Sequence, residues 1–243
     1  MIVNIMKIIK FCEEKYHISK TETIKLSTPQ YYAKHPNIMI RDFLEPKSID
    51  YIKYKKPTLH TTQDLNKLNA NSSFEGQGML IAQNIKIVNE LTKNVYIFCT
   101  MQIEDNEDPS IETGKQFSED YDSFYTLKNP QKFADTISDL LRQEFDSEHK
   151  KIIVHAIHQK IKYKDDKTNI FDNLPDAISD RKNQDYLEII FTKTKESHDL
   201  PGNNFEKNKE YRFAWIILDE SQNALDVSEE LLLPALKLRD FTN

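Results

Sequence analysis

Glycine is scarce in this chain, with 4 residues among 243. Rossmann dehydrogenases and P-loop NTPases hold nucleotide phosphates with glycine-rich turns, in the patterns G-x-G-x-x-G and G-x-x-x-x-G-K-[ST]. Neither pattern occurs in the sequence. The scarcity of glycine therefore argues against both of these nucleotide-binding folds.

Cysteine is scarcer still, and long apolar runs are missing. Cys12 and Cys99 each lie in a short apolar segment, which is typical of buried reduced thiols in a cytoplasmic protein rather than of disulfides. No run approaches the ~18 apolar residues that a membrane span needs. Residues 1–11 are interrupted by Asn4, Lys7 and Lys10, so they predict a first strand and not a signal peptide.

The chain does hold enough apolar and aromatic side chains for a core. Hydrophobic residues make up 38% of the sequence, and there are 13 Phe and 11 Tyr, each of which buries a large area. The length lies near the upper end for one domain and also allows two, but no repeat or low-complexity linker divides the chain. We predict one α+β domain spanning 1–243, with a mixed, mostly antiparallel sheet and few helices.

Periodicity predicts one long helix with particular clarity. Asn129 is a favoured N-cap, Pro130 fits the first helical position, and an apolar stripe follows at helical spacing. Its members are Phe133, Ile137, Leu140, Leu141 and Phe145. A shorter helix is expected over 62–71, whereas loops are expected over 30–36 and over the acidic segment 104–122. The expected strands are 6–12, 22–27, 51–62, 79–88, 95–103, 123–128, 152–163, 186–192, 213–218 and 225–234.

Charge is distributed unevenly along the chain. Residues 1–60 hold eleven Lys or Arg against six Asp or Glu, a balance of +5, and the whole chain carries −6, so the remainder carries −11. A basic amino-terminal segment suits a phosphate-bearing ligand or nucleic acid. An ordinary lysine-rich surface explains the same pattern.

The most informative stretch is 203–218, in which a charged loop runs into an apolar, aromatic-rich strand. Glu210 and Arg212 stand at the start of that strand, two residues apart. Because side chains alternate along a strand, both charges lie on one face. They either pair with each other, as a structural ion pair, or face a ligand.

Short motifs at both ends of the chain resemble an uncharacterised family of bacterial and phage proteins. That family ends in F-x-K, a variable loop and E-x-x-x-E-[YW]-R, which match Phe191-Thr192-Lys193 and the segment from Glu206 to Arg212. It opens with elements matched here by Ile9-Lys10-Phe11, by the run from Lys25 to Pro29, by Tyr31-Tyr32 and by Arg41-Asp42-Phe43-Leu44-Glu45. The resemblance covers about a third of the chain.

The same layout is similar to the split sheet of the ADP-ribosyltransferase superfamily, particularly its nucleic-acid-modifying toxins. That resemblance implies a toxin or phage-defence effector that uses NAD to modify a nucleic acid or protein acceptor. Glu210 would polarise the ribose and steady an oxocarbenium-like transition state, as carboxylates do in glycoside cleavage. The remaining roles, which concern NAD binding, would fall to Lys10, Thr28, Tyr31, Tyr32 and Arg212.

The sequence also departs from that pattern, which keeps a second interpretation open. Lys10 stands where the better-known transferases have Arg or His, and Asn208 stands where a Glu or Gln precedes the catalytic Glu. A non-catalytic binding or sensor module, or a phage-encoded inhibitor acting through a protein partner, would carry the same scaffold. No metal site is expected, because His155 and His158 fall on opposite faces of a strand.

Overall fold

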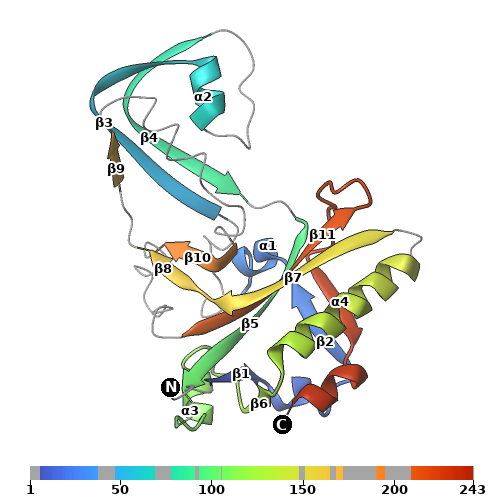
Figure 1. The fold of residues 1–243 in the computed structure, drawn as a ribbon. Coiled ribbons are helices and arrows are strands. Elements are labelled where there is room, and N and C mark those ends of the chain that lie inside the picture. Colours follow the sequence, from blue (N-terminus) through green and yellow to red (C-terminus); the bar gives the residue numbers. More distant parts are fainter. Residues whose placement is uncertain are drawn as a thin grey trace, which may run out of the picture. The chain divides into compact units, whose positions relative to one another are not determined.

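The computed structural model describes residues 6–37, 47–68, 78–90, 93–104, 106–147, 151–164, 168–171, 190–194 and 209–242. It is an α+β structure with mostly antiparallel strands, as the sequence predicts. The chain divides into two compact units: unit 1 comprises 1–46, 91–162 and 197–243, and unit 2 comprises 47–90 and 163–196. Figure 1 shows the elements of both. The single domain over 1–243 stays a prediction.

A seven-stranded antiparallel sheet forms unit 1. Its strands are β1 (Met6–Cys12), β2 (Thr23–Ser27), β5 (Val95–Glu104), β6 (Ser123–Leu127), β7 (Ile152–Lys160), β11 (Glu210–Asp219) and β12 (Glu230–Pro234). Its helices are η1 (Glu14–Tyr16), α1 (Pro29–Ala33), α3 (Ile111–Lys115), α4 (Pro130–Ser147) and η4 (Leu236–Phe241). The strand expected over 225–234 is thus shorter than predicted.

β5 is the central strand, and the way its neighbours pair with it splits the sheet. Ile97 is opposite both Ser27 of β2 and Ala214 of β11, while Met101 is opposite both Ile9 of β1 and Glu210 of β11. A strand has only two edges, so β11 occupies one edge and β1 and β2 share the other in tandem. On that shared edge, β2 pairs with β5 at Ile97 and β1 pairs with it at Met101. Residues 98–100 of β5 therefore lie between the two strands.

The predicted helix is confirmed as α4, which packs on one face of this sheet (Figure 1). The Oδ1 atom of Asn129 accepts a hydrogen bond from the Lys132 amide at 3.0 Å, so Asn129 is the N-cap. All five stripe residues are buried in a core cluster with β-strand residues such as Phe98, Phe213 and Trp215. The apolar face of α4 therefore supplies much of the core on this side.

A smaller cluster covers part of the opposite face. It contains Ile9, Phe11 and Ile103, with Phe117 and other partly buried residues packed against it. The sequence predicts a loop over 104–122, but this segment contains the short helix α3, capped by Ser110. Gly114 of α3 lies so close to Phe11 that a Cβ atom there would come within 2.7 Å of the ring. Glycine is required at this position for the close approach.

Unit 2 has a long β-hairpin as its main element. The structure gives its elements as β3 (Lys47–Thr61), α2 (Thr62–Leu68), β4 (Met79–Glu90), β9 (Thr168–Phe171) and β10 (Thr192–Thr194), while β8 (Lys162–Lys164) begins at the boundary of the units. β3 pairs antiparallel with β4 and parallel with β9, and β8 pairs with β10. The β3–β4 register shifts between Lys53 and Thr58, an irregularity that accommodates Pro57 inside the strand.

Other sequence predictions meet different outcomes. The sequence predicts a loop over 30–36, but 29–33 form α1, because Thr28 caps the helix and Pro29 fits its first turn. The strand expected over 186–192 lies mostly outside the described residues, as do the motif residues 41–45 and 206–208. No described helix is both long and apolar enough to cross a membrane.

Candidate functional site

The Glu210–Arg212 pair is buried at the start of β11. Arg212 donates from Nε at 3.1 Å and from Nη2 at 2.7 Å to the same carboxylate oxygen, Oε1 of Glu210. The side chains are 2% exposed for Arg212 and 10% exposed for Glu210. Of the two alternatives that the sequence left open, the structure shows the ion pair. Each charge is held in place by the other, because an isolated buried charge is costly.

An unusual backbone conformation leads into the pair. Lys209 has a φ of 44°, in the left-handed region that a lysine rarely adopts. Its carbonyl accepts a hydrogen bond from the Gln102 amide at 2.9 Å, and its Nζ contacts both carboxylate oxygens of Glu107 at 2.9 and 3.1 Å. These contacts hold the turn that sets Glu210 at the first position of β11. No pattern in the sequence indicated this role for Lys209.

Lys10 lies at the interval between β1 and β2. Its Nζ donates to the Cys99 carbonyl at 2.9 Å and lies 4.6 Å from the centre of the Phe98 ring. Burial lowers the pKa of Lys10, while the carboxylate of Glu210 is near enough to raise it in part. The ammonium group therefore binds a backbone oxygen of β5 in the interval between its ladder pairs with β2 and with β1.

Lys10 and Glu210 belong to opposite faces of the sheet. Ile9, Met101 and Glu210 stand opposite one another across β1, β5 and β11, so their side chains share a face. Lys10 follows Ile9 and points to the other face, where Phe98 belongs to the core cluster under α4. The two chain ends do meet at β5, as the ADP-ribosyltransferase resemblance requires, but these two side chains approach its edge from different sides.

The other predicted NAD-binding residues form a separate group around α1. Thr28 is fully buried, and its Oγ1 accepts from the Tyr31 amide at 3.4 Å as the helix cap. Ser27, next to it, pairs with Ile97, four residues along β5 from the Met101 that faces Glu210. At ~3.3 Å per residue that offset is about 13 Å along the strand. The structure therefore places Thr28 in a helix cap, well along the sheet from Glu210.

Tyr31 and Tyr32 are half-buried and lie edge to face, with ring centres 5.6 Å apart. Lys25 lies over the Tyr31 ring at 4.6 Å and donates to its hydroxyl at 3.0 Å and to Glu230 at 2.7 Å. Burial opposes the charge of Lys25, but the hydrogen bonds to Glu230 and Tyr31 raise its pKa overall. This arrangement ties β2, α1 and β12 together, and it occupies one edge of the Tyr31 ring.

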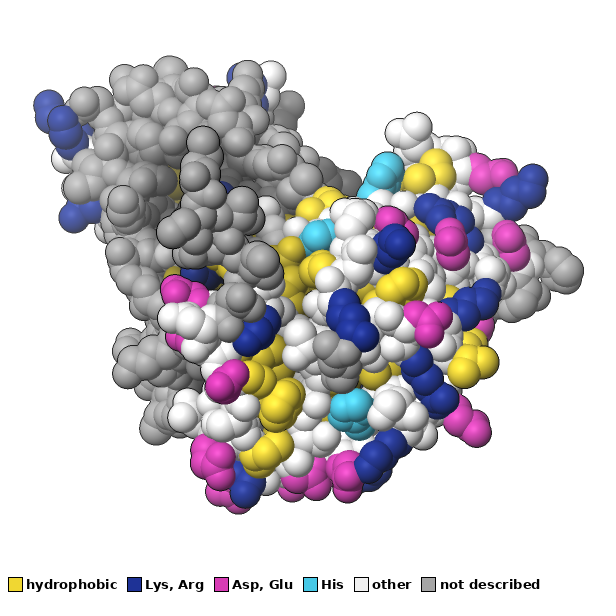
Figure 2. All heavy atoms as spheres, turned by 60° about the horizontal axis from the view of Figure 1, so that its bottom comes forward, with side chains coloured by type: hydrophobic (Ala, Val, Ile, Leu, Met, Phe, Trp, Pro, Cys, Tyr) yellow, Lys and Arg dark blue, Asp and Glu magenta, His cyan; other side chains and the backbone are white. Residues whose placement is uncertain are grey.

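The basic amino-terminal segment contributes a mixed surface to unit 1. Four of its lysines lie against carboxylates, in the pairs Lys15–Glu13, Lys20–Glu14, Lys25–Glu230 and Lys34–Glu229. Figure 2 shows Lys and Arg side chains interspersed with Asp and Glu over the described atoms of one face. Two of these carboxylates, Glu229 and Glu230, come from outside the segment and offset two of its five excess positive charges. The pairs favour the ordinary solvated surface over a nucleic-acid site in this segment.

A polar chain between α4 and the sheet was missed by the sequence reasoning. The Asp135 carboxylate accepts from Gln131 Nε2 at 2.9 Å, which turns the Gln131 Oε1 towards His158 Nε2 at 3.1 Å. His158 Nε2 must then carry the proton, so Nδ1 accepts from the Tyr211 hydroxyl at 2.6 Å. Burial lowers the pKa of His158, with Asp135 raising it in part. Gln131 and Asp135 share a helix face, but no sequence signal shows which strand lies beside it.

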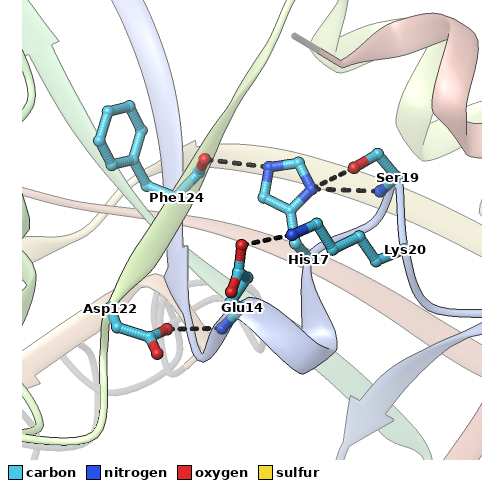
Figure 3. Close-up of polar contacts among 6 residues, drawn as sticks. All are labelled: Glu14, His17, Ser19, Lys20, Asp122 and Phe124. Atoms are coloured by element: carbon cyan, nitrogen blue, oxygen red, sulfur yellow. Dashed lines mark hydrogen bonds and ion pairs between the residues drawn. The ribbon is translucent and has the colours of Figure 1, made fainter.

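His17 is fixed in a similar way beside η1 (Figure 3). The Ser19 amide donates to His17 Nδ1 at 3.2 Å, so Nδ1 is an acceptor and Nε2 donates to the Phe124 carbonyl at 3.1 Å. In the same region the Glu14 amide donates to Asp122 at 2.6 Å, so these contacts attach η1 to the start of β6. Within the described part of the chain, no group of three His, Cys, Asp or Glu residues is placed to hold a metal ion.

Comparison with family models, with curated proteins and with solved structures finds no match to this chain. The interpretation of the site therefore depends on its geometry.

Proposed function

We propose that this protein is a non-catalytic binding module that acts through a protein partner, on a split sheet of the kind that the sequence resemblance implies. The observation that carries this proposal is the Glu210–Arg212 pair. The residue that would have to polarise a ribose is nearly excluded from solvent and holds an arginine with one oxygen. A carboxylate engaged in this way contributes to folding rather than to the stabilisation of an external cation.

The other charged and polar groups support the same conclusion. Lys10 is bonded to a backbone carbonyl on the opposite face of the sheet, and Thr28 is buried as a helix cap. Three of the residues assigned to NAD chemistry thus have structural tasks within the described residues. A sensor or inhibitor needs only the scaffold and a surface that a partner recognises.

ADP-ribosyl transfer is the second candidate, and one specific observation favours it. β1 and β2 share an edge of β5 in tandem, so the sheet is split beside Lys10. In this alternative NAD is the substrate, Glu210 stabilises the developing positive charge at the anomeric carbon, and a nucleic acid or protein is the acceptor.

The two candidates predict different behaviour for Glu210→Gln. A structural pair predicts that the variant loses about 3 kcal/mol of unfolding free energy, because the buried Arg212 loses its ion pair with Glu210. Asp139→Asn, which breaks the exposed pair with Arg142 on α4, should change stability far less and serves as the matched control. Replacing both members of the pair by apolar side chains, as Glu210→Leu together with Arg212→Met, should recover most of the loss.

Urea unfolding followed by circular dichroism measures these differences. In parallel, the wild-type protein is incubated with labelled NAD together with DNA, RNA or a protein lysate. We expect neither nicotinamide release nor label transfer. A Glu210→Gln variant of wild-type stability, together with NAD turnover that the substitution abolishes, would establish the transferase and overturn the binding module.

A further inference from the structure

The β3–β4 hairpin exposes apolar side chains that the described structure leaves uncovered. Met79 is 77% exposed, Ile81 is 70% exposed and Leu59 is 51% exposed. Leu59 stands directly opposite Ile81, and Met79 lies two residues from Ile81, so the three form one strip on one face of the hairpin. Leu80, on the other face, is 46% exposed. Scattered apolar residues are common on surfaces, but a cross-strand pair with a third apolar residue beside it on the same face forms a patch.

Positive charge accompanies this apolar strip. The charged residues among 52–67 and 78–85, where side chains are described, are Lys53, Lys55, Lys56, Lys67 and Asp64. The four lysines are exposed, whereas the Asp64 carboxylate accepts from the Thr61 amide at 2.9 Å and from its hydroxyl at 2.7 Å. The one acidic group of this described set thus caps the start of α2. The described side chains of the hairpin and α2 are thus mostly basic, although the chain as a whole carries −6.

β4 also offers backbone groups to a partner. In the described part of the chain, β4 pairs with β3 alone, so its outer edge carries the amides and carbonyls of an edge strand. Long edge strands with apolar side chains are sites at which another chain docks unless they are protected. Residues 78–84 carry no charge and no proline that would protect this edge.

We propose that the β3–β4 hairpin is the partner-docking surface of this protein and that its partner is an acidic, extended protein segment with apolar side chains. This inference rests on the proposed binding function and names the surface that performs it. The aliphatic strip fits aliphatic side chains of the partner, and the lysines fit surrounding carboxylates. The strip contains no aromatic ring on which a base would stack, which favours protein over single-stranded nucleic acid.

The test uses the full chain and a defined probe. The probe is a fluorescent peptide of about the length of β4, which has 12 residues, so that it can add one strand along this edge. It carries leucines at alternate positions, which share one face of a strand, and glutamates between them. Two control peptides of equal length replace Leu by Ala or Glu by Lys. Fluorescence anisotropy measures the dissociation constant for the wild type, for Met79→Ser/Ile81→Ser and for Lys53→Gln/Lys56→Gln.

We expect the acidic, leucine-bearing peptide to bind and both control peptides to fail. The apolar double variant should weaken binding by about tenfold or more, because it removes most of the apolar area of the strip. The lysine variant should weaken it mainly at low salt. All four substituted residues are exposed, so wild-type unfolding curves for both variants are expected and verify that the fold is intact.

Other outcomes overturn the inference. Binding that is absent, or equal in the wild type and both variants, removes the hairpin as the docking surface. If the protein binds phosphatidylserine vesicles and not the peptide, and Met79→Ser/Ile81→Ser abolishes that binding, the hairpin is a membrane-binding surface. Self-association in sedimentation velocity that Met79→Ser/Ile81→Ser abolishes would make the partner a second copy. These experiments test the docking surface only. The NAD assay tests separately whether the protein is catalytic, so the failure of one proposal can be told from the failure of the other.

Discussion

The two units of this chain differ at several of their polar and apolar side chains. In unit 1, the buried Arg212 is paired with Glu210, and the half-buried His158 is paired with Tyr211. In unit 2 the hairpin exposes Met79 and Ile81 while burying His60 and Tyr54, whose polar side-chain atoms have no hydrogen-bond partner among the described residues. A region that buries unsatisfied polar groups and exposes apolar ones is not optimised for its own stability. The difference supports the proposal that unit 2 carries the docking surface and unit 1 the scaffold.

The largest effect should come from the aromatic core of unit 1. Phe213 is fully buried and contacts the rings of Phe98, Phe133 and Trp215, so Phe213→Ala should lower the unfolding free energy by about 4 kcal/mol. Urea unfolding measures the loss, and Tyr16→Ala, at 58% exposed, is the control with an expected change below about 0.5 kcal/mol.

Amide hydrogen exchange tests whether unit 2 opens independently of unit 1. Ile52 is 3% exposed in β3, and Ile52→Ala should raise exchange in the β3 and β4 peptides while leaving β5 and β11 unchanged. Equal loss of protection in both units would show that they unfold together, and the contrast between them would then be wrong.

A smaller change of opposite sign is expected at His60. Both ring nitrogens are buried without a hydrogen-bond partner in the described part of the chain, and the Tyr54 ring lies 5.2 Å away. Replacing such a group by an apolar one removes a desolvation cost, so His60→Leu should stabilise unit 2 by about 1 kcal/mol. The readout is slower exchange of β3 and β4 amides. Destabilisation by this substitution would show that the imidazole is satisfied in solution.

Acid should weaken each unit through one histidine. Burial lowers the pKa of His60, with Asp64 raising it in part, and burial likewise lowers the pKa of His158. The unfolded state takes up protons first, so both groups reduce stability as the pH falls below about 6.5. Exchange between pH 7.5 and 5.5 should therefore rise in β3 and β4 through His60 and in β7 through His158. His60→Leu should remove the response of β3 and β4 and leave that of β7.

Sequence patterns predicted the parts of this structure that follow from local periodicity. The apolar stripe of α4 and its Asn129 cap are confirmed, because a helix of this length buries one face and needs a cap wherever it packs. The alternation at Glu210 and Arg212 likewise placed both charges on one face, and the structure shows the ion pair.

What the sequence could not show depends on strand register. Lys10 and Glu210 reach β5 from opposite faces because Ile9, not Lys10, stands in register with Met101 and Glu210, and a shift of one residue would reverse this. The left-handed Lys209 depends on long-range pairing in the same way. Local patterns determine the faces of single strands but not which strands lie together.

The last prediction compares the reactivity of a buried thiol in unit 1 with that of an exposed thiol in unit 2, and it involves the smallest change in stability. Cys12 lies in the unit 1 core, and burial raises its pKa to about 11. At pH 8 about one molecule in a thousand then carries the reactive thiolate, so iodoacetamide should modify Cys12 very slowly. A cysteine introduced by Met79→Cys, at a position 77% exposed, should react at the rate of a free thiol.

Mass mapping in a Cys99→Ser background follows both of these thiols, with urea-unfolded protein as the control in which they react alike. Slow modification of Cys12 beside fast modification at position 79 is the result that the contrast requires. Fast modification of Cys12 in the folded protein would mean that unit 1 opens readily, because the thiol is reached only when the core around it is exposed. That result would contradict the assignment of unit 1 as the stable scaffold.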